Sequence, residues 1–203
     1  MSLFGLISGA PPSPLLQGEG LYLRPATSAD FVAWVGLREA SRNFLKPWEP
    51  SWPLDDLTRV GFRRRLRRQQ EEMARDESYA FLIFAAGANE LLGGVTIGAL
   101  RRGAAQSATL GYWMGAAHAG KGHMTRAVRR IVGFGFTDLG LHRIEAACIP
   151  ENIASQCLLK RNSFVREGLA RSYLCIDGAW RDHILFARIA GHVMQAANDE
   201  GGS

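Results

Sequence analysis

The chain has 203 residues, of which 47% are hydrophobic and 21% charged, values typical of one globular domain. No apolar run approaches the length needed to cross a bilayer, and residues 1–20 lack the basic start and cleavage site of a signal peptide. Cys148, Cys157 and Cys175 have no C-x-x-C spacing, which argues against a disulfide framework and a zinc site and favours a reduced, cytoplasmic protein without bound metal.

The net charge is +5 and the pI is about 9.5. Much of the excess lies in "RVGFRRRLRRQQ", residues 59–70, which "EEMARDE" follows at once. One interpretation is a solvated helix face whose charge is balanced locally. The other is a basic surface that contacts RNA or an acidic partner.

The first half of the chain begins with an arm rich in proline, glycine and serine over residues 1–20. "LYLRP" alternates like a short strand, and Thr27 or Ser28 then caps a helix over residues 28–40. Three prolines interrupt "FLKPWEPSWP". A second helix, which contains the arginines, is predicted from Asp55 to about Arg75.

The second half alternates strands with two helices. A helix follows Gly122, with Met124 and Val128 on its apolar side, and a short helix follows "EN" at residues 151–152. Asp177-Gly178 is a strong signal for a hairpin between two long strands. The remaining strands are predicted at "YAFLIFAA", "LLGGVTIGAL", "SATLGYWMG" with a kink at Gly111, and "HRIEAACI".

This order predicts an α/β (α+β) domain with a mixed, largely antiparallel sheet of about seven strands and about four helices. The expected boundaries are an arm at 1–20, one domain at 21–190 and a polar tail at 191–203. The order lacks the strict βαβ alternation of a nucleotide-binding Rossmann or P-loop fold.

The loop "GAAHAGKGHM", residues 115–124, begins like a triphosphate-binding loop. Gly122 occupies the place where that motif needs a hydroxyl to hold Mg²⁺, so a triphosphate is disfavoured. The glycines still allow backbone to approach a ligand, and the next helix presents free N–H groups. A pyrophosphate that needs no metal would fit, and a turn that binds nothing is the structural alternative.

The order of elements around this loop resembles the GCN5-related N-acetyltransferase (GNAT) superfamily over residues 21–190. That family's pyrophosphate motif, [RQ]-x-x-G-x-[GA], falls on residues 119–124, where only the central Gly122 matches strictly and Ala119 and Met124 depart from it. "GKGxMT", "SRNFLKPWEP", "NIAS" and "YLCIDGAWRDH" resemble the RimJ/RimL-type branch, which modifies ribosomal proteins.

The resemblance implies acetyl-CoA as the donor and a protein N-terminal amine as the acceptor. It implies that the strand "YWMG" pairs with the pantetheine arm. Asn152 would bond a pantetheine amide, or act only as a helix cap, and Ser155 would approach the sulfur. The expected cofactor-binding residues are Trp113, Met114, Ala119, Gly120, Lys121, Gly122, His123, Met124, Thr125, Asn152 and Ser155.

The catalytic acid and base are harder to assign. Many relatives carry a glutamate just before "GYW", where this chain has Thr109 and Leu110. Glu49, Asp182 and His183 remain as candidate bases. Tyr173 is a candidate acid for the leaving sulfur beside Ser155, with packing as its alternative role. An α-amine has a pKa near 7.7 to 8.0, so an N-terminal acceptor needs less help from a base than a lysine does.

The sequence therefore predicts an acetyl-CoA-dependent N-acetyltransferase for protein N-termini, of the ribosomal-protein-alanine type. An enzyme for a small amine, such as an antibiotic or polyamine, and an RNA-binding module built on the arginine-rich helix are the alternatives. No membrane partner is expected, and both a monomer and a homodimer remain open.

Overall fold

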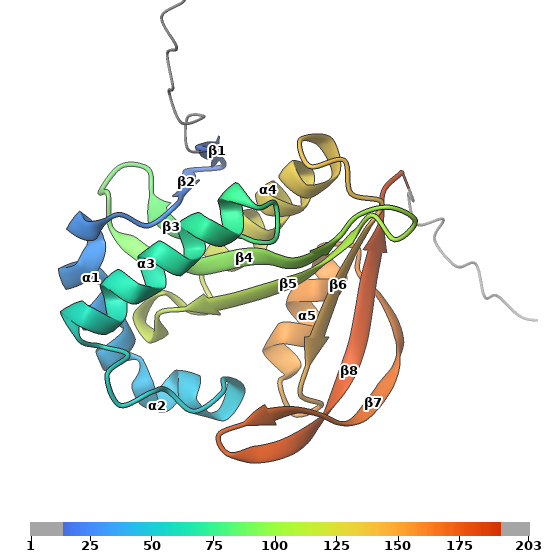
Figure 1. Ribbon diagram of the computed structural model, residues 1–203. Helices are drawn as coiled ribbons and strands as arrows, with labels where there is room; N and C mark the ends of the chain where they lie inside the picture. Colours follow the sequence, from blue (N-terminus) through green and yellow to red (C-terminus); the bar gives the residue numbers. More distant parts are fainter. Residues whose placement is uncertain (1–13, 192–203) are drawn as a thin grey trace, which may run out of the picture.

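Eight strands form one mixed sheet in the computed structural model, which describes residues 14–191 (Figure 1). Neighbouring strands are antiparallel, except for β5 and β6, which are parallel. The strands, in their spatial order, are β1 (Leu16–Gly18), β2 (Leu21–Arg24), β3 (Tyr79–Ala85), β4 (Leu91–Arg101), β5 (Ser107–Met114), β6 (Arg143–Cys148), β8 (Ala179–Ile189) and β7 (Val165–Ile176).

Helices cover both faces of this sheet. α1 contacts β4 and α3 contacts β3 on one face, whereas α4 and α5 pack on the other, against β4 and β6 (Figure 1). The α-helices of the described chain are α1 (Phe31–Ala40), α2 (Arg42–Leu45), α3 (Arg59–Ala74), α4 (His123–Thr137) and α5 (Ile153–Arg161). The predicted fold class is thus confirmed, with one more strand and one more helix than expected.

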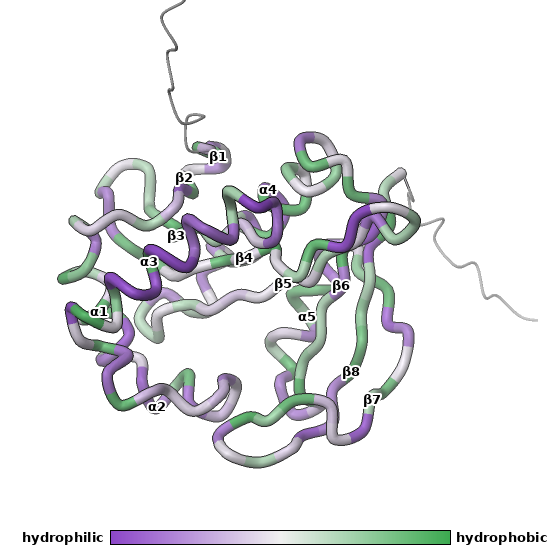
Figure 2. Tube along the Cα trace, viewed as in Figure 1, coloured by the Kyte–Doolittle hydropathy of each residue, from purple (hydrophilic) through white to green (hydrophobic). Residues whose placement is uncertain are grey.

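Each face of the sheet has its own apolar core. The larger cluster lies under α4, where Val128 and Ile131 are fully buried against residues of the central strands. The smaller one lies under α1 and α3 around Trp34 and Phe62, whose rings are 5.0 Å apart. Burial of such side chains is the main force that holds the layers together. Figure 2 shows the contrast between the apolar inner strands and the hydrophilic α3 that lies in front of them.

The arginine-rich helix begins later than predicted. α3 starts at Arg59 and not at Asp55, because the Thr58 hydroxyl accepts a hydrogen bond from the Gly61 N–H at 3.1 Å and so caps the helix. Asp55 lies in the turn before it and forms an ion pair with Arg64. Asp55 is therefore not the first residue of the helix, as the sequence predicts, but a partner for one of its arginines.

Three further differences concern short segments. β1 lies inside the expected N-terminal arm and pairs with β2. The proline-containing segment is partly helical, as α2 and a 3₁₀ turn over Lys46–Trp48. The irregularity expected at Gly111 lies on the partner strand instead, where the β4–β5 register shifts between Gly98 and Arg101.

The predicted hairpin is present. Asp177 and Gly178 both have positive φ, +46° and +80°, and they join β7 to β8. Most of the expected polar tail, residues 192–203, and residues 1–13 of the arm lie outside the described residues. Within residues 14–191, no helix combines the length and the apolar character that a bilayer-spanning segment needs.

Candidate active site

The candidate site lies where β5 and β6 separate. The two parallel strands pair only over Ser107–Thr109 and Arg143–Glu145. Residues 110–114 of β5 continue along β4 without a partner on their other side (Figure 1). The peptide groups on that free edge can therefore bond an extended ligand in the gap.

The loop after β5 forms a cradle at the start of α4. Gly120 and Gly122 have φ of +74° and +76°, which L side chains rarely adopt, and nothing lies within 4 Å of where a Cβ would be at either position. Gly122 caps α4, so the N–H groups of the first turn have no partner within the helix. The residues present thus fit a pyrophosphate without a metal.

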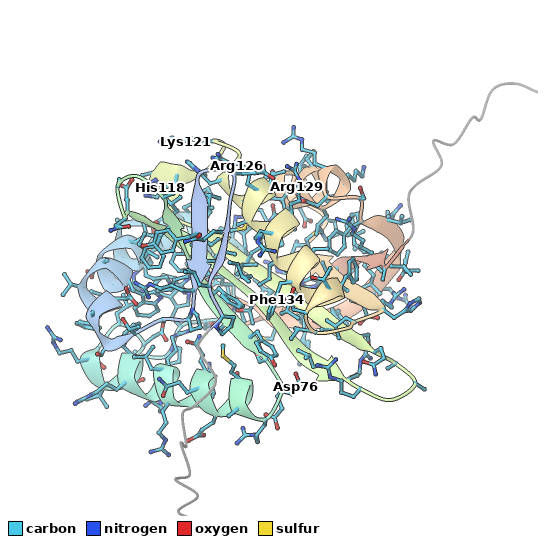
Figure 3. The ribbon with its side chains drawn as sticks, turned by 90° about the horizontal axis from the view of Figure 1, so that it is seen from above. Asp76, His118, Lys121, Arg126, Arg129 and Phe134 are labelled. Carbon is cyan, nitrogen blue, oxygen red and sulfur yellow. The ribbon has the colours of Figure 1, made fainter. Side chains whose placement is uncertain are left out.

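Basic side chains surround this cradle. Figure 3 shows His118, Lys121 and Arg126 gathered at the loop and the start of α4. Arg126 lies 2.8 Å from His123 Nδ1. Burial, and then the positive charge of Arg126, lower the pKa of His123, so its ring is neutral near neutral pH. Lys121 is exposed and supplies charge at the rim.

The start of α5 faces the same gap. Asn152 caps this helix by accepting a hydrogen bond from the Ser155 N–H at 3.0 Å. The capping role considered from the sequence is therefore present. Ser155 is buried one turn further on. Asn152 keeps its amide N–H₂ group available for a ligand, because only its oxygen serves as the cap.

Ser155 forms a hydrogen bond with a tyrosine that the sequence analysis did not select. The hydroxyl of Tyr112, on β5, lies 2.6 Å from Ser155 Oγ. Burial raises the pKa of Tyr112 well above its usual value and outweighs the opposite effect of the Ser155 hydrogen bond. Burial also raises the pKa of the nearby Cys148 thiol. Both groups stay protonated near neutral pH.

A cavity of about 610 Å³ connects these features. We call it the loop cavity. Apart from Lys121, all the expected cofactor-binding residues line it, namely Trp113, Met114, Ala119, Gly120, Gly122, His123, Met124, Thr125, Asn152 and Ser155. Tyr112 and Glu49 line it as well.

A second cavity, of about 660 Å³, lies on the α1 and α3 side of β5. We call it the arginine cavity, because Arg38, Arg64, Arg65 and Arg68 line it. The two cavities share Glu49, Tyr112 and Trp113, so they meet near the C-terminal end of β5, at a place that we call the junction.

Glu49 is the only candidate base from the sequence that lies at this junction. Its carboxylate accepts two hydrogen bonds of 2.8 Å from Arg38 and one of 2.7 Å from Trp52 Nε1. The Arg38 guanidinium lies 4.0 Å from the centre of the Trp52 ring. A carboxylate that accepts three hydrogen bonds can hold the side chains of Arg38 and Trp52 in fixed positions beside the junction.

The remaining candidate bases, Asp182 and His183, and the candidate acid Tyr173 lie in the C-terminal hairpin and line neither cavity. Asp182 accepts a hydrogen bond from the Ser172 N–H at 2.8 Å and so holds an irregular part of β7. Tyr173 packs edge-on against His183, with ring centres 5.7 Å apart. His183 is buried, and its Nδ1 lies 3.0 Å from the Arg181 carbonyl oxygen.

Strand alternation could have pointed to Tyr112. Successive side chains of a strand lie on opposite faces, so Tyr112 and Trp113 cannot both face the same helices. Tyr112 packs against the α4 side, where Ser155 lies, and Trp113 packs against the α1 and α3 side. The sequence predicts cofactor binding at Trp113 and Met114 and offers Tyr173, beyond α5, as the candidate acid.

The chemistry that this arrangement permits is a transfer between two bound groups. One ligand can lie in the loop cavity with its reactive end at Ser155 and Tyr112, and another can reach the same place through the arginine cavity. Tyr112 offers a proton to a leaving group. No cluster of three or more possible metal ligands occurs within residues 14–191.

Comparisons with known proteins point to one family. Residues 20–165 match the family model described as "Acetyltransferase (GNAT) domain". The chain is 39% identical to a probable N-acetyltransferase, YjcK, of Bacillus subtilis over 173 residues, which cover 85% of this chain and 96% of that protein. It is 32% identical to the [ribosomal protein uS5]-alanine N-acetyltransferase of Escherichia coli over 185 residues, which cover 91% and 95%.

A solved structure extends the likeness to the fold. Mycobacterium smegmatis RimJ in complex with CoA-disulfide superposes with a TM-score of 0.82 at 34% identity, over 91% of this chain and 90% of that one.

Proposed function

This chain belongs to the GNAT acetyltransferase family, and we propose that it acetylates the α-amine at the N-terminus of a protein, as the ribosomal-protein-alanine type does. It is an acetyl-CoA-dependent N-acetyltransferase, and the proposal concerns its acceptor. One observation carries the proposal: the two cavities meet at Glu49, Tyr112 and Trp113, which allows a donor and a peptide terminus to converge.

The carboxylate at the junction favours an α-amine over a lysine. The oxygens of Glu49 already accept hydrogen bonds from Arg38 and Trp52. At pH 7.5 about a third of an α-amine is neutral, against about a thousandth of a lysine side chain. An N-terminal acceptor therefore suits a junction whose carboxylate is already bonded on both oxygens.

Acetyl-CoA, when bound, supplies an acetyl group activated as a thioester. In the proposal, the amides at the start of α4 bind its pyrophosphate, and the free edge of β5 orients its pantetheine arm, with Asn152 beside it. The neutral amine forms an N–C bond to the acetyl carbon as the C–S bond breaks, and Tyr112 gives its proton at Oη to the departing sulfur, with Ser155 keeping that hydroxyl in place. The amine nitrogen loses one proton to water, and Tyr112 regains one from water.

Contacts beside Glu49 support a narrow acceptor. The tip of the β7–β8 hairpin reaches the segment after α2, where the Asp177 N–H donates to the Glu49 carbonyl oxygen at 3.1 Å. Lys46 lies 3.7 Å from the Asp177 carboxylate. These contacts hold the hairpin against a residue that lines both cavities, so a terminus fits there more easily than the middle of a folded chain.

A thiol-release assay tests the proposal. The purified protein is given acetyl-CoA with peptides that begin with alanine or serine, with lysine peptides blocked at the N-terminus, and with polyamines and aminoglycosides. We expect release of CoA with the free N-terminal peptides. Release with a small amine alone would favour the small-amine enzyme and contradict the proposed acceptor.

A further inference from the structure

One stripe of the arginine-rich helix faces the arginine cavity. Gly61, Arg64, Arg65 and Arg68 line that cavity, and their spacing of three and four residues places them on one side of α3. Arg64 and Arg68 are exposed at its open rim, whereas Arg63 and Arg67 are exposed and do not line it. The helix thus has one row of arginines beside the cavity and another that faces only solvent.

Several hydrogen-bonding groups on this wall have no partner. Within residues 14–191, four side-chain nitrogen or oxygen atoms are buried without a hydrogen bond. Three of them, Arg38 Nε, Arg65 Nε and Asp56 Oδ2, belong to residues that line the arginine cavity. Buried polar groups are normally paired, so the two unpaired arginine N–H groups beside the cavity favour a ligand with hydrogen-bond acceptors, whereas Asp56 Oδ2 can pair only with a donor.

The charge of the cavity wall is positive. Four arginines line it, against the two carboxylates of Glu49 and Asp56. Glu49 is already bonded by Arg38, and Asp56 lies 2.5 Å from Arg65. Arg68 has only a long contact, 3.5 Å, with Glu72 on the exposed surface, and such a pair contributes little. Arg65 and Arg68 therefore keep donors for an anionic group.

The turn before α3 is built tightly against the helix. A Cβ at Gly61 would lie 2.1 Å from the Asp55 carbonyl oxygen, so only glycine lets residues 55 and 56 approach this closely. Their carboxylates reach Arg64 and Arg65, and these ion pairs fix the wall of the cavity. The arginines are thereby oriented before any ligand binds.

We propose that the arginine cavity selects acceptors with a carboxylate side chain within the first few residues after the acetylated one. The inference rests on the proposed function, because the amine must reach the junction at Tyr112 from this cavity. Arg68 and Arg65 then bind the carboxylate. The tryptophans of the same wall, Trp34, Trp52 and Trp113, contact the intervening chain.

Two variants on the same helix test this assignment. Arg68→Gln removes a cavity arginine that pairs with Glu72, and Arg67→Gln removes a solvent-facing one that pairs with Glu71. Each variant loses one positive charge and one ion pair with the glutamate four residues further along the helix. Stability and acetyl-CoA binding should change equally in both, which makes Arg67→Gln a matched control.

The readout is kcat/KM for two peptides that differ only by glutamate or glutamine at the third position, measured at low salt. We expect the wild-type protein and Arg67→Gln to prefer the glutamate peptide by about fivefold. Arg68→Gln should lose most of this preference. Comparing variants on the same peptides cancels any effect of glutamate on the pKa of the amine.

Three results would overturn the inference. If the wild-type protein acetylates both peptides at equal rates, or if both variants lose the preference equally, the selectivity is contradicted while the N-terminal acceptor stands. If neither peptide is acetylated but a small amine is, the proposed function is contradicted as well.

Discussion

Tyr112 Oη and Ser155 Oγ lie 2.6 Å apart although 43 residues separate them in the chain. One group comes from β5 and the other from the first turn of α5, on the two sides of the gap between β5 and β6. The hydrogen bond therefore connects two elements that line the loop cavity, at the proposed reacting centre.

Replacing Tyr112 by phenylalanine should lower kcat by about 100-fold, because a general acid contributes at least that much. The affinity for acetyl-CoA should change little, since Tyr112 lies at its reactive end and not at the pyrophosphate cradle. Steady-state rates and equilibrium binding of acetyl-CoA measure the two effects separately. A loss of binding equal to the loss of rate would assign Tyr112 a packing role.

The raised pKa of Tyr112 also predicts the pH profile. Its hydroxyl is the acid in its protonated form, and burial moves its ionisation above the usual value of about 10. The rate should rise with pH as the acceptor amine loses its proton and then stay level up to about pH 10. A fall beginning near pH 8 would contradict the proposed acid.

Gly122→Val should abolish the increase in melting temperature that acetyl-CoA gives without Mg²⁺. The φ of +76° is strained for any L side chain, and a branched one would also occupy the space that the pyrophosphate needs. The melting temperature of the free protein should fall by only a few degrees, because the site is exposed. A normal shift with acetyl-CoA in the variant would contradict the proposed cradle.

Glu49→Gln should raise the KM for the peptide severalfold and reduce kcat only modestly. The carboxylate orders Arg38 and Trp52 at the junction, and an amide cannot accept both bonds from Arg38. The dependence of rate on pH should remain in the variant. If that dependence disappears while acetyl-CoA still binds, Glu49 is a general base and the account of an easily deprotonated acceptor fails.

Asp30→Asn should lower the free energy of unfolding at pH 7 by about 1–3 kcal/mol. Burial raises the pKa of Asp30, but hydrogen bonds from Arg24 and Thr27 outweigh it, so the net shift is downward. A lowered pKa stabilises the fold above about pH 4, and this stabilisation is lost as the pH falls through the folded value. Urea unfolding should thus show a difference at pH 7 that shrinks by pH 3.

The fold and the backbone conformation of the glycine loop before α4 could be predicted from the sequence because local signals determine them. The helix after Gly122, the Asp177-Gly178 turn and the cap at Asn152 all follow from residues within a few positions of one another. The start of α3 was placed too early, since Asp55 and Thr58 are both good caps and only the tertiary position of Arg64 separates them.

The catalytic acid could not be assigned in the same way. The motif predicted Ser155 on α5, but its partner Tyr112 lies on β5, and strand alternation gives only the face that Tyr112 occupies and not its contact with Ser155. The bonds from Arg38 and Trp52 to Glu49 also depend on tertiary structure. From the sequence, Glu49 is one candidate base among three. The sequence does not show that its carboxylate already accepts hydrogen bonds from Arg38 and Trp52.

The site of acetylation on one peptide tests the central claim most directly. A peptide with a free alanine at its N-terminus and a lysine six residues later is incubated with the protein and acetyl-CoA, and tandem mass spectrometry locates the added acetyl group. The account predicts acetylation of the alanine α-amine and an unmodified lysine. Acetylation of the lysine in preference to the α-amine would contradict it.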